Sequence, residues 1–446
     1  MTQSRTDNHT YELYGSVLRG TAFENETDTV SYIPYHEDMS PLASPMPVGR
    51  GKTAHNRFCY QPMEGQDADE QNGAPSDLTF ERYARLASGG AGLVWVEAVS
   101  ICKEGRSNPY QLLLDENTKA RFAALVETIK SNGLKSTGKE PVVLMQMNHS
   151  GRYSKPNGTP DPIVAYVNPA IDGGKNPRVA CDDYLSALPE QYAKSAKLAE
   201  ECGFDGVDLK ICHGYLLSEL MSGYDRSGKY GGSLENRTRL IAESAQAIDA
   251  VLGEKTIRAA RLNLFDGYGD SHSMGEKPGV LYDLTEAGAV IDILKQNGLS
   301  LLNVTMGSPY RTPDVSRPYR RGLDMPKSNS VFALYRILNG AYDIKRQYPE
   351  LAVVDTGISL LGGMSPFAAA GLVAEGMTDF VGFGRMSFAY PSLARDILAG
   401  TFDPKKACVC CGGCSYLKKN VQKSGCIIRN KFYNGIYQTY QASLKK

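Results

Sequence analysis

The sequence has little that would direct the chain to a membrane, to an export pathway or to a nucleic acid. No apolar run approaches the length of a bilayer span, and the first residues, MTQSRTDNHTYELYG, lack the apolar core of a signal peptide. The 49 Lys and Arg residues balance 49 Asp and Glu residues, so no net charge favours nucleic acid or an anionic membrane. We therefore expect a cytoplasmic protein with a small-molecule substrate, whose cysteines are reduced thiols or metal ligands rather than disulfides.

The sequence also lacks a glycine-rich G-x-G-x-x-G turn after its first strand-like segment, which argues against a dinucleotide-binding open sheet. Instead, short and nearly continuous apolar segments recur, as in a parallel sheet buried on both faces. There are eight of them, at residues 56–62, 93–100, 142–147, 206–212, 257–263, 300–306, 352–357 and 380–385. Helical patterns separate them, at residues 78–88, 118–131, 189–202, 235–252, 283–296, 330–345, 366–375 and 391–400. Eight alternations predict a closed (β/α)8 TIM barrel, with a doubly wound open sheet as the alternative.

Cysteines are concentrated near the end of the chain. Half of the ten cysteines lie between positions 408 and 426. Three of them are separated by two residues each, and a fourth follows further along, a spacing that can hold the corners of a [4Fe–4S] cluster. The expected ligands are Cys408, Cys411, Cys414 and Cys426. A cluster would indicate an oxygen-poor, anaerobic setting.

Two alternatives stay open for this segment. Gly412 and Gly413 allow the tight turn that a cluster needs, but a zinc site with four cysteine ligands is the rival, although its usual signature is two separated C-x2-C pairs. The spacing also permits Cys410 to replace Cys408 as the first ligand.

Polar residues gather where the predicted strands end. A TIM barrel builds its active site at the carboxyl ends of its strands, so these residues are expected to meet on one rim. They are Gln61, Glu97, Gln146, His149, Lys210, His213, Tyr215, Arg261, Asn263 and Arg385. Two long irregular connections, 151–185 and 307–328, are rich in Pro, Gly, Tyr and Arg and are typical of lids over such a site.

The longest motif is His213-Gly-Tyr215-Leu-Leu followed by Tyr230-Gly-Gly-Ser-Leu-Glu235-Asn236-Arg237. Shorter motifs accompany it: Asn56-Arg57, Pro62-Met63, Gln146-Met-Asn-His149-Ser-Gly-Arg152, Ala260-Arg261-Leu262 and Gly382-Phe-Gly384-Arg385. Together they resemble the flavin-dependent old yellow enzyme family over nearly the whole chain. The cysteine spacing resembles the iron–sulfur branch of that family, which includes dienoyl-CoA reductase and trimethylamine dehydrogenase.

The resemblance implies that FMN binds inside the mouth of the barrel. It suggests Pro62, Met63, Ala98, Gln146, Arg261, Gly357, Gly384 and Arg385 as the cofactor-binding residues. Gly384 and Arg385 would offer N–H groups and a guanidinium to the phosphate. Gln146 can both donate and accept at the pyrimidine edge, and Arg261 would stabilise the negative charge of the reduced flavin. The expected domains are an N-terminal extension (1–40), an FMN-binding TIM barrel (41–400) and a C-terminal [4Fe–4S] segment (401–446).

Two departures from the family pattern concern the reactive centre. Glu64 follows the Pro-Met pair where relatives often have Thr or Cys, which puts the flavin potential in doubt. Lys210 stands where many relatives have a first histidine, so a cation would join His213 in holding a substrate carbonyl. Tyr215 is the expected general acid.

These features predict an ene-reductase that uses NADH or NADPH to reduce the activated C=C bond of an α,β-unsaturated carbonyl compound, such as a planar aromatic enone, an enoate or an enoyl thioester. Because only about 20 residues follow Cys426, we expect no second nucleotide-binding domain, and NAD(P)H would reach the same FMN. The alternative is an amine or alcohol dehydrogenase that passes electrons through the cluster to a carrier protein. A zinc-stapled, non-catalytic barrel is a third reading, and a homo-oligomer is compatible with all of them.

Overall fold

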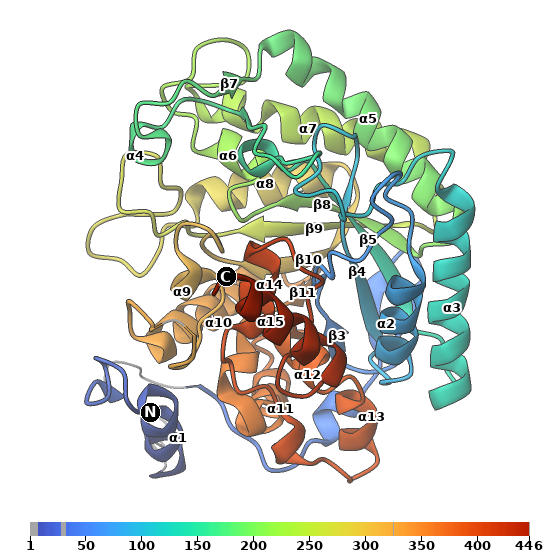
Figure 1. Cartoon of the computed structure of the whole chain (residues 1–446), viewed down its shortest axis with the longest axis vertical. Coiled ribbons are helices and arrows are strands. Elements are labelled where there is room, and N and C mark those ends of the chain that lie inside the picture. The colour runs from blue at the N-terminus through green and yellow to red at the C-terminus, as the bar shows by residue number, and fades with distance from the viewer. Residues whose placement is uncertain (1–7, 28–32, 324, 446) are drawn as a thin grey trace.

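The computed structural model describes residues 8–27, 33–323 and 325–445, and its central feature is an eight-stranded parallel sheet (Figure 1). In order around the sheet the strands are β3 (Phe58–Tyr60), β4 (Leu93–Ser100), β5 (Val142–Asn148), β8 (Gly206–Ile211), β9 (Ile257–Asn263), β10 (Leu299–Thr305), β11 (Ala352–Val354) and β12 (Val381–Phe383). β12 pairs with β3, and a parallel bridge between Val354 and Phe380 joins the remaining edges. The predicted TIM barrel is confirmed, and each predicted strand contributes to it.

A helix follows every barrel strand. These helices are α2 (Asp77–Ala87), α3 (Lys119–Thr137), α5 (Asp182–Glu201), α7 (Leu234–Val251), α8 (Thr285–Gln296), α10 (Ser330–Gln347), α11 (Ser365–Ala374) and α13 (Leu393–Leu398). In α7 the Ser233 side chain caps the first turn, and the predicted apolar stripe, with Leu240 and Ile248, is buried against the barrel. α5 begins at Asp182, seven residues before the predicted start at residue 189. Asp182 and Asp183 lie in its first turn, where their negative charges stabilise the positive end of the helix dipole.

The amino-terminal end of the barrel is plugged by a hairpin of β1 (Met46–Gly49) and β2 (Lys52–Ala54). Its Val48 and Ala54 pack with side chains from inside the barrel, among them Trp95 and Leu144. A filled barrel floor leaves the opposite end, where the strands finish, as the place for a site.

Shorter elements decorate the barrel. They are α1 (Asn8–Leu18), α4 (Pro169–Asp172), α6 (Leu216–Met221), α9 (Pro313–Ser316), α12 (Arg385–Ala389), β6 (Ile163–Val164), β7 (Arg178–Val179) and four 3-10 turns at Ser40–Ala43, Gly151–Tyr153, Ile358–Met364 and Pro404–Lys406. The predicted lid segment 307–328 contains only such a short piece, and the segment 151–185 contains short pieces and the first turn of α5. Residues 1–7 and 28–32 of the expected N-terminal extension lie outside the described residues, whereas α1 packs beside α10.

The carboxyl-terminal segment folds back across the barrel, where α14 (Gly413–Lys419) and α15 (Lys431–Ser443) lie near the middle of the view in Figure 1. The Ser424 N–H donates to the Gly65 carbonyl after β3 (2.7 Å), and the Leu323 N–H donates to the Cys411 carbonyl (3.0 Å). The segment is thereby attached to the strand-end face of the barrel. The proposed boundaries after residues 40 and 400 stay a prediction. Within the described residues no helix has the length and apolarity to cross a membrane.

Candidate active site

Three of the predicted residues come together just beyond β8. The Lys210 ammonium lies 4.1 Å from the centre of the Tyr215 ring, and the His213 and Tyr215 rings are 6.4 Å apart. His213 has a φ of +67°, a conformation that non-glycine residues rarely adopt and that often marks a functional position. Its Nε2 lies 3.5 Å from the Thr305 hydroxyl at the end of β10.

A carboxylate that the sequence marked only as a departure lies in the middle of this group. Glu64 is buried, with its Oε1 3.8 Å from Lys210 Nζ and its Oε2 3.0 Å from Lys418 Nζ on α14. Burial raises the pKa of Glu64, but Lys418, Lys210 and the nearby Tyr215 hydroxyl outweigh this effect and the net pKa is lowered. Sequence reasoning missed Lys418 altogether; its only signal was a lysine one helical turn after Cys414.

Burial sets the protonation of the reactive group, which we define as Lys210, His213 and Tyr215. Burial lowers the pKa of Lys210 to about 8, although the Glu64 carboxylate opposes this effect. Burial and then the cations Arg261, Lys210 and Lys418 hold the pKa of His213 well below its usual range, so the imidazole is neutral. Burial and Glu64 raise the pKa of Tyr215 well above its usual range, so the phenol keeps its proton.

Both predicted lid segments reach this group through tyrosines. Tyr153 and Tyr310 stack with ring centres 3.7 Å apart, and the hydroxyls of Tyr215 and Tyr310 are 3.0 Å apart. Tyr153 meets Tyr215 edge-on at 5.9 Å. The two lids therefore meet in an aromatic cluster directly over the proposed proton donor.

Buried polar atoms without a partner mark the mouth of the barrel as fitted to a polar ligand. Arg261 Nε, Asp208 Oδ1 and Asn263 Oδ1 are buried and make no hydrogen bond within the protein. Such atoms are uncommon in folded proteins, because an unsatisfied buried group costs roughly 1–3 kcal/mol. A flavin, whose pyrimidine edge carries both donors and acceptors, would satisfy groups of this kind.

The other expected flavin residues line the same mouth. The Gln146 amide donates to Asp208 Oδ2 (2.6 Å), which also accepts from the Trp95 indole (2.9 Å), and burial raises the Asp208 pKa to about 6. The Ala98 carbonyl accepts from the Gln111 amide (3.0 Å).

Glycines bring the strand ends close to one another. Gly357 has a φ of +96°, and a side chain on Gly384 would come within 3.2 Å of Met63 Sδ. Gly384 follows β12, and Pro62 and Met63 follow β3. The short distance between Gly384 and Met63 therefore places these two strand ends side by side. A side chain at either glycine would crowd its neighbours, so these turns need glycine.

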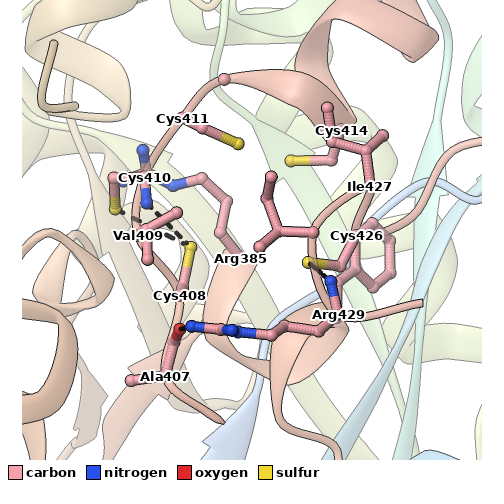
Figure 2. A pocket seen from close by; sticks show the side chains of 13 residues that line it. Arg385, Ala407, Cys408, Val409, Cys410, Cys411, Cys414, Cys426, Ile427 and Arg429 are labelled. Carbon is pink, nitrogen blue, oxygen red and sulfur yellow. Dashed lines mark hydrogen bonds between the residues drawn. The ribbon is translucent and has the colours of Figure 1, made fainter. Parts of the chain in front are cut away.

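Arg385, the expected phosphate ligand, is the first residue of α12. Its Nη2 donates to the Pro318 carbonyl (2.6 Å), its Nη1 is buried without a partner, and its side chain extends into the pocket of the C-terminal cysteines (Figure 2). Burial lowers its pKa, but negative charge on the neighbouring Cys410 and Cys408 sulfurs outweighs this effect and the net pKa is raised.

The four expected cysteine ligands face that pocket from different sides. Figure 2 shows the sulfurs of Cys408, Cys411, Cys414 and Cys426 around a central space. The Cys410 thiol points away from it and donates to the Ser359 carbonyl (3.1 Å). Across residues 8–27, 33–323 and 325–445, no three His, Cys, Asp or Glu side chains converge closely enough to hold a single metal ion.

Residues 41–403 match the NADH:flavin oxidoreductase / NADH oxidase family. The chain belongs to this family. The predicted resemblance is therefore confirmed, and so is the predicted enzyme class, a flavin-dependent oxidoreductase.

Curated relatives include an NADPH dehydrogenase of Halalkalibacterium halodurans, 27% identical over 66% of this chain and 80% of the relative. An NADH oxidase of Thermoanaerobacter brockii is 28% identical over 80% of this chain and 51% of the relative. The chain thus spans about half the length of the second protein.

Solved structures share the fold. A 2-naphthoyl-CoA reductase complex has a TM-score of 0.72 at 22% identity, covering 89% of this chain and 58% of the other. Histamine dehydrogenase from Rhizobium sp. 4-9 has a TM-score of 0.64 at 19% identity, covering 87% and 52%. At these identities the likeness establishes the barrel architecture.

Proposed function

We propose that this protein is an FMN-dependent ene-reductase that reduces the activated C=C bond of an α,β-unsaturated carbonyl compound with NADH or NADPH as the hydride donor. The observation that carries the proposal is the reactive group at the end of β8. It combines a protonated phenol with a buried cation 4.1 Å from the phenol ring and a neutral imidazole whose ring centre lies 6.4 Å from that of the phenol.

The flavin would be held by the residues at the barrel mouth. Arg261 and Gln146 would face its pyrimidine edge, the backbone of Pro62, Met63, Ala98 and Gly357 would line it, and Gly384 with the free Nη1 of Arg385 would meet its phosphate. When bound and reduced, the flavin supplies the hydride.

The protein residues then stabilise and quench the charge that develops on the substrate. Lys210 and His213 donate hydrogen bonds to the carbonyl oxygen as it becomes an enolate, and each such donor is typically worth about 3–4 kcal/mol of barrier. Tyr215 gives its proton to the α-carbon, which its retained proton allows. The Tyr153 and Tyr310 rings favour a flat substrate, since aromatic stacking adds about 0.5–1.5 kcal/mol.

We also propose a [4Fe–4S] cluster on Cys408, Cys411, Cys414 and Cys426. The support is their arrangement around one space with Cys410 turned to Ser359. A zinc site is usually signalled by two separated C-x2-C pairs, whereas here three cysteines follow one another at two-residue intervals and the fourth stands apart, which favours a cluster. The cluster passes single electrons.

The test separates the two half-reactions. Lys210→Ala should slow flavin reoxidation by an enone on the order of a hundredfold or more, because one donor to the enolate is lost. Flavin reduction by NAD(P)H should change much less, and Lys210→His should recover part of the reoxidation rate. Stopped-flow traces in which both half-reactions slow equally would rule out Lys210 as a substrate donor.

A specific observation favours the second candidate, a dehydrogenase that passes electrons to a carrier protein. Residues 404–446 contain nine Lys and Arg residues and no Asp or Glu, although the whole chain has no net charge. Exposed Val409 and Ile428 lie at the rim of the cysteine pocket. A basic segment that exposes apolar side chains beside the cysteines suits an acidic one-electron carrier.

Salt dependence distinguishes the candidates. If electrons leave through this surface, reduction of an acidic ferredoxin-type carrier by the amine- or alcohol-reduced enzyme should weaken steeply with ionic strength. Turnover of an enone with NAD(P)H and no carrier protein supports the ene-reductase.

A further inference from the structure

Glu64 is the point at which the C-terminal segment touches the reactive centre. Each of its carboxylate oxygens faces a different lysine, Lys210 at 3.8 Å and Lys418 at 3.0 Å. The side chains of Glu64 and Lys210 are 6% and 3% exposed, whereas that of Lys418 is 29% exposed. One buried carboxylate is thus shared between two cations, and the closer one comes from outside the barrel.

Several contacts hold Lys418 in this place. The Lys418 carbonyl accepts a hydrogen bond from the Gln66 amide (3.1 Å), two residues beyond Glu64. The Ser424 N–H donates to the carbonyl of Gly65 (2.7 Å). The loop that carries Glu64 and the helix that carries Lys418 are therefore joined by backbone contacts as well as by the ion pair.

The same loop is held rigidly on its barrel side. The Gly65 N–H donates to Glu97 Oε2 (2.8 Å), and Glu97 is paired with buried Arg82. A side chain at Gly65 would collide with Arg82, with contacts of 2.5 Å. Because the loop backbone is fixed from both sides, the Glu64 side chain stays within reach of both lysines, and its contacts with them decide where the carboxylate lies.

Lys418 also acts on Lys210 through charge. Its positive charge opposes protonation of Lys210 and of His213, and Glu64 favours protonation of Lys210. Glu64 itself stays ionised, because the two lysines outweigh the effect of burial and lower its pKa. Removing Lys418 would leave Glu64 to pair with Lys210 alone.

We propose that Lys418 is a positioning residue of the reactive centre: by holding Glu64 from the C-terminal segment, it keeps the Lys210 ammonium from pairing fully with Glu64 and so leaves it available to the substrate oxygen. This inference rests on the proposed function for the identity of the substrate oxygen. It also means that the segment carrying the cysteines and the substrate-binding cation are coupled, since Cys414 and Lys418 share α14.

Charged and titratable groups from several elements face Lys210. From the barrel and its strand-end loops they are Glu64 after β3, Asp208 and Cys212 from β8 and the turn after it, Arg261 from β9, and His213 and Tyr215 beyond β8. These groups stay unchanged in the test, and only Lys418, from α14, is substituted.

The experiment measures the ionisation of Lys210 directly in the flavin-loaded enzyme. Competitive acetylation with acetic anhydride across pH, followed by mass spectrometry of the peptide that contains Lys210, yields the pH midpoint of that amine whether or not the enzyme turns over. Lys418→Met should raise the midpoint by about one pH unit, a tenfold change in proton affinity, because a repelling charge is lost and Glu64 pairs with Lys210 alone. Lys418→Arg should keep the wild-type midpoint, and so should the exposed neighbour control Lys419→Met.

A second readout links the midpoint to substrate. Lys418→Met should raise KM for an enone several-fold. The rate constant for flavin reduction by NAD(P)H, measured by stopped flow, should stay near the wild-type value. An unchanged Lys210 midpoint in Lys418→Met would overturn the inference, as would an equal shift in Lys419→Met. If the midpoint shifts but the wild-type enzyme reduces no enone, the coupling stands and the proposed ene-reductase function fails.

Discussion

The charge of Lys210 decides the pH range in which the candidate site can bind an enolate. The ammonium is buried among Glu64, Arg261 and Lys418, and its pKa of about 8 lies far below that of an exposed lysine. The sequence marked this residue as a departure from the family pattern, but only the burial of its neighbours brings its titration close to neutral pH.

We predict that flavin reoxidation by an enone falls as the pH rises through about 8, because Lys210 then loses its proton. Lys210→Arg should abolish this alkaline limb, since a guanidinium stays charged. Stopped-flow reoxidation rates between pH 6.5 and 9.5 measure it. A flat wild-type profile would contradict the assignment.

The free energy of unfolding should also depend on pH through Lys210, and it should rise with pH where the reoxidation rate falls. The lysine of the unfolded chain holds its proton up to about pH 10.5, whereas the folded protein releases it near 8, so the unfolded state binds more protons in between. The free energy of unfolding contributed by Lys210 should therefore rise between pH 8 and 10. Denaturant titrations of wild type and Lys210→Met should show this slope only in the wild type.

At the scale of elements, the seam between β11 and β12 closes the barrel with a single bridge, Val354 to Phe380. Asp355 supports this seam by accepting from the Gly382 N–H (3.0 Å), and its second oxygen is buried without a partner. A side chain at Gly382 would come within 2.2 Å of the Asp355 carbonyl, so only glycine fits there. Burial raises the pKa of Asp355 to about 8.

We predict that Asp355→Asn resists alkaline destabilisation. The folded protein holds a proton on Asp355 that the unfolded chain lacks above pH 4, so this stabilisation is lost as the pH rises through about 8. The amide keeps the acceptor without the charge. Melting temperatures at pH 6 and pH 9 should differ less for the variant than for the wild type; an equal drop would show that another group titrates at the seam.

The two lid segments form the second functional pair of elements, joined by the Tyr153–Tyr310 stack. Tyr310→Ala should raise KM for a planar aromatic enone by about tenfold, from the loss of one stacking partner. Tyr310→Phe retains the ring and should stay within about twofold. A small non-aromatic enone serves as the control substrate, and an equal KM change for both substrates would argue against stacking.

At the scale of the whole molecule, the cysteine segment is attached to the strand-end face of the barrel. Its contacts with the barrel include the Ser424–Gly65 and Leu323–Cys411 hydrogen bonds and the Lys418–Glu64 ion pair. The only tryptophan, Trp95, is buried inside the barrel and reports on barrel unfolding alone.

We predict that Cys411→Ser loses the broad brown absorbance of a cluster, whereas Cys410→Ser keeps it. Anaerobically prepared wild type should contain about four irons and four sulfides per chain. In Cys411→Ser the segment after residue 404 should become sensitive to limited proteolysis, while the melting transition followed by Trp95 fluorescence shifts little. Zinc in place of iron would refute the cluster.

Much of the architecture could be predicted because its signals are local. Each barrel strand is a short apolar segment and each covering helix carries its own apolar stripe, as in α7, so their number and order follow from the sequence. Motif spacing likewise placed His213, Tyr215 and Arg261 at strand ends, which meet on one rim in any TIM barrel. The spacing of the cysteines in the sequence could not predict which of their side chains face the pocket.

The sequence by itself determined that this chain forms a parallel barrel, that it resembles flavin-dependent oxidoreductases and that five of its cysteines share one segment. Only the tertiary structure decided that Glu64 pairs with Lys210, that Lys418 reaches the same carboxylate from α14, and that Arg385 extends toward the cysteines. The physical reason is that charge pairing and burial depend on distances between residues far apart in the chain. Such distances arise only when the barrel closes and the C-terminal segment packs across its mouth.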